Sequence, residues 1–225
     1  MATEAASIPD AILSKANAVR LIARSIMKLA DFAGPALPVS DDDVRAAAKV
    51  LCVTTRHVRA VMAVESRGRG VHPETRRPII LFEPHIFARE TKGRFSATHP
   101  DISYATWGGK PYPATQGQRY DQLVAAMALD ETAALRSASY GLFQIMGFNH
   151  RACGHASVQS FVRDMIQGER AQLRCFALFI VANHDMHAAL KASDWAGFAR
   201  RYNGPGFAQH GYDQKLKAAF AQAAA

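Results

Sequence analysis

The 225-residue sequence lacks several features that would place it in a specialised class of protein. It has no run of about 18 apolar residues, so it predicts no membrane-spanning helix. The segment from Met1 to Pro9 lacks the basic and apolar parts of a signal peptide, which predicts a chain without its own export signal. Cysteine is scarce: Cys52, Cys153 and Cys175 are odd in number and show no CxxC spacing. They predict buried structural thiols rather than a disulfide framework or a cysteine-based zinc site.

Metal-binding and strongly localised charge patterns are also missing. The nine histidines form no HExxH motif, so we expect neither a metal site nor a cofactor. The net charge is +8, but the basic residues are scattered singly or in pairs. This distribution predicts a basic surface that attracts polyanions, including an anionic outer-membrane surface, without specificity.

The chain has no internal repeat and no long linker rich in Ser, Gly or Pro. Residues 34–38, which contain two prolines and a glycine, are the nearest thing to a boundary. They predict a division into residues 1–38, a helix and linker, and residues 39–225, the main domain. Apolar residues at helical spacing predict the first helix over residues 9–32. Its basic residues can approach an anionic membrane, but its apolar stripe has the ordinary width of a helix packed on a core.

The main domain is rich in helix signals. Ser40 followed by three aspartates predicts a helix start, and Thr54 or Thr55 begins a second helix that runs to about Ser66. Residues 71–112 carry many prolines and glycines and the apolar run 79–82, which predicts a small, irregular β-region. Further helices are predicted at residues 117–129, 131–137, 157–166, 169–183 and 194–202, and a last one around Tyr212, Leu216 and Phe220. The predicted fold class is mainly α (α+β), a helical domain with a small inserted β-region.

Glu65 is the first candidate for chemistry. It shares one face of its predicted helix with Val58, Val61 and Met62, at spacings i, i+3, i+4 and i+7. A carboxyl group on a buried face, at the negative end of a helix dipole, is expected to have a raised pKa. A glycosidase needs such a protonated carboxyl to donate a proton to the leaving glycosidic oxygen. The alternative is a helix-end glutamate that reaches solvent.

Two later segments carry further candidates. Gln144 lies within an apolar run bracketed by glycines, where it can bond a sugar amide or hydroxyl, or equally the protein backbone. Tyr202 and Asn203 precede Gly204-Pro205-Gly206, so they either sit at a cleft edge or form part of a helix C-cap.

The three segments together resemble the signature segments of the goose-type lysozyme and lytic transglycosylase superfamily. In this sequence they read Glu65-Ser66, Gly141-Leu142-Phe143-Gln144 and Arg201-Tyr202-Asn203. The chain is most similar to the N-acetylmuramidase domains of modular phage endolysins, over about residues 43–220. Its most specific stretches are AVESRGRG, RPIILFEPHIF, LRSASYGLFQIMGFNH and RYNGPGFAQHGYD.

This resemblance implies a lysozyme-like fold that cleaves the β-1,4 bond between N-acetylmuramic acid and N-acetylglucosamine in peptidoglycan glycan strands. It makes Glu65 the general acid and places Gln144, Tyr202 and Asn203 around the scissile sugar pair, with Ser139 close by. It also implies a monomer, made in the host cytoplasm and released to act on the wall in the periplasm.

The position of residues 71–112 between Glu65 and the Gly141–Gln144 segment departs from lytic transglycosylases and bears on mechanism. A transglycosylase needs one acid/base, whereas an inverting hydrolase uses a second carboxylate to activate water. Glu83 is the candidate for that base, because it follows the strand-like run; the alternative is an ion pair with Arg77 or Arg89. Glu74 and Asp101 are weaker candidates in loop-like surroundings. A lytic transglycosylase is therefore the alternative activity.

A helix-turn-helix DNA-binding module is the alternative from another class. Residues 44–64 have the pattern of a helix, a short turn and a second helix, in a chain of net positive charge. The second helix offers Arg56, His57 and Arg59 to read bases, but it ends in Glu65, which would repel phosphate. We therefore expect no nucleic-acid partner.

Overall fold

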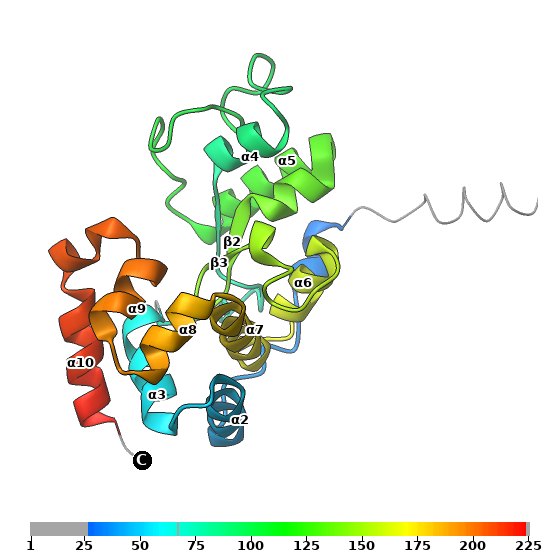
Figure 1. The fold of residues 1–225 in the computed structure, drawn as a ribbon. Coiled ribbons are helices and arrows are strands. Elements are labelled where there is room, and N and C mark those ends of the chain that lie inside the picture. The colour runs from blue at the N-terminus through cyan, green and yellow to red at the C-terminus, as the bar shows by residue number, and fades with distance from the viewer. Residues whose placement is uncertain (1–26, 67, 224–225) are drawn as a thin grey trace, which may run out of the picture.

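The computed structural model describes residues 27–66 and 68–223 (Figure 1). Most of the predicted helix over residues 9–32 therefore lies outside the described residues. Its described end forms the short 3-10 helix η1 (Leu29–Phe32), whose Phe32 side chain is fully buried in the core. Leu37 forms a β-bridge with Gly168, so the segment before residue 38 packs on the main body. The division at residue 38 stays a prediction.

The described chain is mainly helical, as predicted, with one small sheet. Its α-helices are α2 (Asp41–Leu51), α3 (Thr55–Glu65), α4 (Pro84–Glu90), α5 (Gln116–Arg136), α6 (Val158–Met165), α7 (Glu169–Ala182), α8 (His184–Lys191), α9 (Trp195–Tyr202) and α10 (Tyr212–Gln222). Two further 3-10 helices are η2 (Gly147–Asn149) and η3 (Pro205–His210). The strands are β1 (Ile80–Phe82), β2 (Ala138–Tyr140) and β3 (Ile145–Met146). Within the described ranges no helix combines the length and the hydropathy needed to cross a bilayer.

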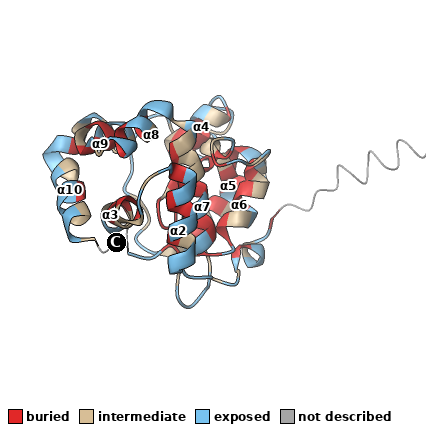
Figure 2. Ribbon diagram, turned by 60° about the horizontal axis from the view of Figure 1, so that its bottom comes forward, coloured by how far each residue is buried: buried red, intermediate tan, exposed pale blue. Residues whose placement is uncertain are grey.

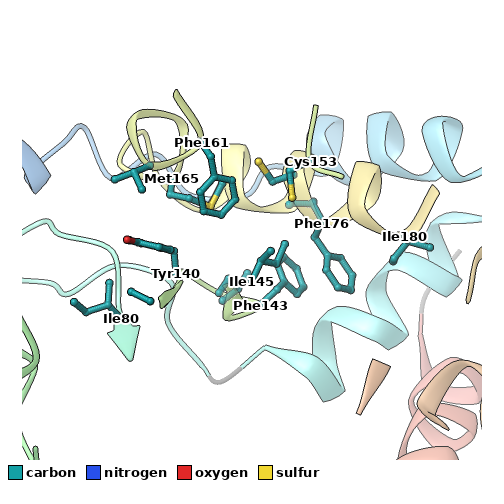
Figure 3. Close-up of a cluster of buried hydrophobic side chains, with 14 of the residues drawn as sticks. Ile80, Tyr140, Phe143, Ile145, Cys153, Phe161, Met165, Phe176 and Ile180 are labelled. Atoms are coloured by element: carbon teal, nitrogen blue, oxygen red, sulfur yellow. The ribbon is translucent and has the colours of Figure 1, made fainter. Parts of the chain in front are cut away.

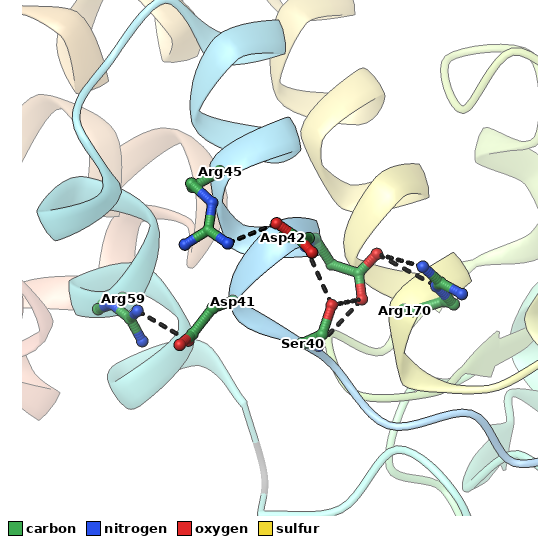
Figure 4. Close-up of polar contacts among 7 residues, drawn as sticks. Ser40, Asp41, Asp42, Arg45, Arg59 and Arg170 are labelled. Atoms are coloured by element: carbon green, nitrogen blue, oxygen red, sulfur yellow. Dashed lines mark hydrogen bonds and ion pairs between the residues drawn. The ribbon is translucent and has the colours of Figure 1, made fainter.

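The predicted start of α2 is confirmed in detail (Figure 4). The Ser40 hydroxyl accepts a hydrogen bond from the Asp43 amide at 3.3 Å, and the Asp43 carboxylate accepts one from the Ser40 amide at 2.9 Å. This reciprocal pair satisfies two backbone groups that a helix start otherwise leaves unbonded. Arg170 of α7 pairs with Asp43 at 3.0 Å, so the cap also ties α2 to α7. The bond from the Ser40 hydroxyl holds the pKa of Asp43 below its ordinary value.

The prediction for residues 71–112 needs a correction. This region contributes one three-residue strand, β1, and its partners β2 and β3 come from beyond α5 in the order β1-β2-β3. Ile80 pairs with Tyr140 in the antiparallel register of β1 and β2. The region also contains α4, because Pro84 at the first helical position has the backbone angle that starts a helix and ends the strand. The remaining residues, up to 112, form turns, bends and irregular segments, with one antiparallel bridge between Val71 and Pro78.

The predicted break in the helix pattern at residue 130 is confirmed. The helices predicted at 117–129 and 131–137 together form α5, in which two helical segments are separated by the non-helical backbone of Asp130 at φ −159° and ψ 97°. Helix α8 was not predicted, because no glycine or proline separates it from α7. Its start is set by the backbone of Asn183, whose extended ψ of 85° ends one helix and begins the next.

The core is continuous and centres on α7, which packs against α2, α6 and α8. Figure 2 shows that buried residues line the inward faces of these helices. In the core close-up, Phe143 lies over Phe176 of α7, with ring centroids 4.0 Å apart and planes 6° apart (Figure 3). Of the three predicted buried thiols, Cys153 and Cys175 are buried. Cys52 is exposed, because it occupies the left-handed C-cap position of α2, outside the core-facing stripe.

Candidate active site

Glu65 is the last residue of α3 and is only 8% exposed. Val58 and Val61 on the same face are buried, so the predicted apolar surroundings are present. The Nδ2 atom of Asn203 donates a hydrogen bond to Glu65 Oε2 at 3.0 Å. The helix therefore delivers a carboxyl group to the edge of the core, and a residue from the end of α9 holds it there.

Glu65 lines a cleft of about 720 Å³ together with residues of the two later signature segments. The cleft is lined by Val64, Glu65, Trp107, Phe143, Gln144, Ile145, Met146, Asn149, Phe179, Tyr202, Asn203, His210 and Tyr212. Glu65 is the one carboxylate among these lining residues. Three segments far apart in sequence thus meet around a single acid.

Gln144 sits in the turn between β2 and β3 with its backbone in the left-handed region, at φ +49°. Its Nε2 donates to the carbonyl oxygens of Gly141 at 2.8 Å and Ile79 at 3.1 Å. Its Oε1 accepts a hydrogen bond from the Ser139 hydroxyl at 3.0 Å. The bond from Gln144 to the backbone, one of the two interpretations, is therefore observed, and its amide braces the turn. The residue also forms part of the cleft wall, and its bond to a sugar stays a prediction.

Ser139 differs in position from the other predicted substrate-binding residues. It is 5% exposed and does not line the cleft. Its hydroxyl lies within hydrogen-bond distance of Gln144 Oε1 at 3.0 Å and of the Leu81 carbonyl oxygen at 3.4 Å, so its geometry is that of a residue that positions a cleft side chain.

Tyr202 and Asn203 end α9 at the cleft. The Tyr202 hydroxyl donates to the Phe143 carbonyl at 2.9 Å, and its ring stacks on Phe198 with centroids 5.9 Å apart. This bond joins the end of α9 to the Gly141–Gln144 turn. The Oδ1 atom of Asn203 is buried and accepts no hydrogen bond from the described residues. Gly204, at φ +83°, is the residue that turns the chain away from the helix.

Glu83, the predicted second carboxylate, occupies the N-cap position of α4 without a side-chain capping bond, and it does not line the cleft. Its Oε2 accepts a hydrogen bond from the Tyr112 hydroxyl at 2.6 Å and lies 3.3 Å from His85 Nδ1. These partners replace the ion pair with Arg77 or Arg89 considered from the sequence. Burial raises the pKa of Tyr112, and the hydrogen bond to Glu83 raises it further, so the phenol remains a neutral donor.

Tyr112 links Glu83 to the cleft by a second contact. Its hydroxyl also interacts with the side chain of Trp107, a cleft-lining residue that is 73% exposed. An exposed indole at the edge of a cleft suits stacking on a sugar face. The weaker carboxylate candidates lie elsewhere: Glu74 is exposed, and Asp101 pairs with Lys110 at 2.5 Å.

Several cleft residues were not identified from the sequence, among them Asn149, Phe179, His210 and Tyr212. Each comes from a different helix, and although Asn149, His210 and Tyr212 fall within the stretches that carry the family resemblance, nothing in those stretches marks them as cleft residues. Their position follows from how α7, η3 and the start of α10 pack, which no local pattern encodes.

The arrangement of α3 does not suit DNA reading. The helix packs against both α2 and α10, so its face is not free to enter a groove. Arg56 lies over the Phe220 ring at 4.8 Å, and His57 is buried against the same ring. Arg59 pairs with Asp41 at 3.0 Å. The three residues that would read bases are therefore occupied within the fold.

Comparisons with known proteins agree with this geometry. The family model for N-acetylmuramidase matches residues 54–224. The crystal structure of the Burkholderia AP3 phage endolysin is similar, with 39% sequence identity and a TM-score of 0.75 over 82% of this chain and 70% of that chain. No curated protein matches the chain significantly. The resemblance to endolysin-type muramidase domains is thus confirmed, and the chain belongs to the N-acetylmuramidase family of peptidoglycan-cleaving glycosidases.

Proposed function

We propose that this protein hydrolyses the β-1,4 bond between N-acetylmuramic acid and N-acetylglucosamine, with Glu65 as the general acid. The observation that carries the proposal is the position of Glu65: a buried carboxyl, over an apolar helix face, at the wall of a cleft. Burial favours the neutral form of a carboxyl group, which is the form that donates a proton. Family membership supports the same bond as the target.

The surrounding residues have roles that follow from their contacts. Asn203 holds one Glu65 oxygen, and its buried Oδ1 offers an acceptor to a sugar amide or hydroxyl. Tyr202 joins the end of α9 to the Gly141–Gln144 turn through its hydrogen bond to the Phe143 carbonyl. Trp107 at the edge offers a face for a sugar ring. Ser139 acts through Gln144 by fixing its side-chain amide.

A lytic transglycosylase is the second candidate, because the cleft lining contains a single carboxylate among the described residues. In that reaction the C6 hydroxyl of the muramic acid attacks its own anomeric carbon, so no second carboxylate is needed to activate water. Hydrolysis by inversion would need such a group. The base role predicted for Glu83 stays a prediction, and its hydrogen bond to Tyr112 supports a positioning role for the Trp107 loop instead.

Mass spectrometry of digested peptidoglycan separates the two activities. Hydrolysis adds a water molecule and leaves reducing-end muramic acid. Transglycosylation leaves the 1,6-anhydro form, which is lighter by the mass of that water. We expect reducing-end products from the wild-type protein and none from Glu65→Gln. Anhydro products from the wild type would replace the hydrolase proposal with the transglycosylase one.

We also propose that the protein acts in host-cell lysis as a phage endolysin, as a monomer that reaches the wall from the cytoplasm. The likeness to the Burkholderia AP3 phage endolysin supports this role. The net charge of +8 favours approach to anionic outer-membrane surfaces. Turbidity assays on Gram-negative cells, intact and with a permeabilised outer membrane, test the role. Absence of lysis in permeabilised cells would contradict it.

A further inference from the structure

A second cluster of reactive side chains lies outside the cleft, between α6, α7 and the loop before α6. His155 Nε2 lies 3.4 Å from Cys175 Sγ, and Cys175 Sγ lies 3.5 Å from Asp164 Oδ2. The third side of the triangle, from His155 Nε2 to Asp164 Oδ2, is 3.4 Å. The buried Cys153 lies near this triangle, beside the helix that carries Phe176 (Figure 3), but the group whose ligand atoms all lie within 4.8 Å of one another is His155, Asp164 and Cys175. None of these residues lines the cleft.

The spacing of these atoms suits a tetrahedral zinc ion. With bonds of about 2.3 Å to sulfur and 2.0–2.1 Å to nitrogen or oxygen, the ligand atoms of such an ion lie about 3.3–3.8 Å apart. The three measured separations fall in this range, so the side chains need little movement to bind an ion. Two thiols, an imidazole and a carboxylate are also ligand types that zinc takes, whereas Mg²⁺ and Ca²⁺ prefer oxygen alone.

The surroundings resemble those of a closed structural site rather than a catalytic one. Cys153 and Cys175 are 1% and 0% exposed, and the side chains of His155 and Asp164 are 18% and 15% exposed. Three protein ligands are in place, and a small movement of the buried Cys153 thiol would supply the fourth and leave no open position for a reacting water. The other carboxylate oxygen of Asp164, Oδ1, pairs with Arg174 at 2.5 Å, and the His155 ring packs edge-on against Phe161. Such outer contacts fix the orientation of ligands.

We propose that His155, Asp164 and Cys175 bind a structural zinc ion, with the nearby Cys153 thiol moving in as the fourth ligand. The ion would fasten the loop before α6, and α6 itself, to α7. Helix α7 carries Phe176, which supports Phe143 in the cleft wall. Zinc would therefore stabilise the frame of the cleft without taking part in the reaction. The sequence expectation of no metal site rested on CxxC and HExxH spacings, and these ligands follow neither, because three separate segments bring them together.

The test begins with the full-length protein purified under reducing conditions. Elemental analysis should find about one zinc ion per chain after dialysis. After removal of zinc with a chelator, Co²⁺ should give the thiolate charge-transfer and intense visible bands of a tetrahedral cobalt site. Chelation should also lower the midpoint of thermal unfolding, and added zinc should restore it.

Variants assign the ligands. Cys175→Ala and His155→Gln should lose the bound zinc and the tetrahedral cobalt spectrum, whereas Cys52→Ser, which changes the exposed cysteine, should keep both. The wild-type cobalt titration needs no variant, so the test remains valid if a variant does not fold. The proposal is overturned if the folded, reduced wild type binds no zinc and gives no cobalt–thiolate band. It is also overturned if Cys153 and Cys175 form a disulfide in the purified protein, or if Cys175→Ala retains the metal.

Discussion

The side-chain amide of Asn203 donates a hydrogen bond to the Glu65 carboxylate at 3.0 Å, across 138 residues of sequence. One partner ends α3 and the other follows the last turn of α9. The bond therefore exists only when the first and last parts of the catalytic domain are packed together. It explains why two of the three signature segments end helices: each helix delivers its final side chains to the cleft.

Glu65→Gln should abolish bond cleavage and keep the fold. The amide keeps the size of the side chain but cannot donate the proton, so activity should fall by about 10²–10⁴-fold. Activity on purified peptidoglycan and the midpoint of thermal unfolding measure the two effects. Glu74→Gln, at an exposed position, is the matched control and should behave as wild type. Full activity of Glu65→Gln would remove Glu65 from the mechanism.

Asn203→Ala should move the pH profile of cleavage as well as lower the rate. A hydrogen bond from a neutral amide favours the ionised form of the carboxyl that accepts it. Without this bond, the activity that depends on protonated Glu65 should persist to higher pH. Asn149→Ala, which changes another amide in the cleft lining, is the control. A profile of unchanged shape in Asn203→Ala would show that the contact does not tune the acid.

Glu83→Gln distinguishes positioning from base catalysis. A glutamine oxygen can still accept the hydrogen bond from Tyr112, so a positioning residue should retain activity within about tenfold of wild type. Glu83→Ala removes that acceptor, so its activity should fall further below wild type than that of Glu83→Gln. The KM and kcat of both variants are the measurements. A loss of about 10²-fold or more in kcat for Glu83→Gln would instead identify Glu83 as the base.

Gly141→Ala should be strongly destabilising. Its backbone has φ +73°, and an added Cβ would lie 2.3 Å from Cδ of Gln172, a buried side chain that accepts a hydrogen bond from the Leu142 amide. We expect a loss of about 3–5 kcal/mol in the free energy of unfolding. Gly108→Ala has a similar φ of +68° with open space around it, so it should cost only about 1–2 kcal/mol. Equal losses in urea-unfolding curves would contradict the steric argument.

Stability should decrease as the pH falls below about 6.5, in part because of His57. Burial lowers the pKa of this histidine, and the nearby charge of Arg56 lowers it further. In the window between its lowered folded pKa and its unfolded value, the unfolded chain binds more protons, so acid favours unfolding. Above that window His57 is neutral in both the folded and the unfolded state, so its contribution to the free energy of unfolding no longer changes with pH.

Urea unfolding at several pH values tests this dependence. His57→Gln should flatten the slope between about pH 7.5 and 5.5, and His184→Gln, at an exposed position, should leave it unchanged. His150, whose pKa is also lowered by burial, should account for part of the slope that remains. The same slope in wild type and His57→Gln would rule out a contribution from His57.

The sequence by itself determined the helical character, the start of α2 and the identity of the acid candidate. These features depend on local physics: a capping serine bonds a backbone amide three residues away, and helical spacing places Glu65 on an apolar face. The tertiary structure decided what each side chain contacts. Ser139 turns inward to Gln144, Glu83 bonds Tyr112, and residues from three segments gather around Cys175. These contacts join residues from separate segments, and only the packing of the helices on α7 fixes their distances.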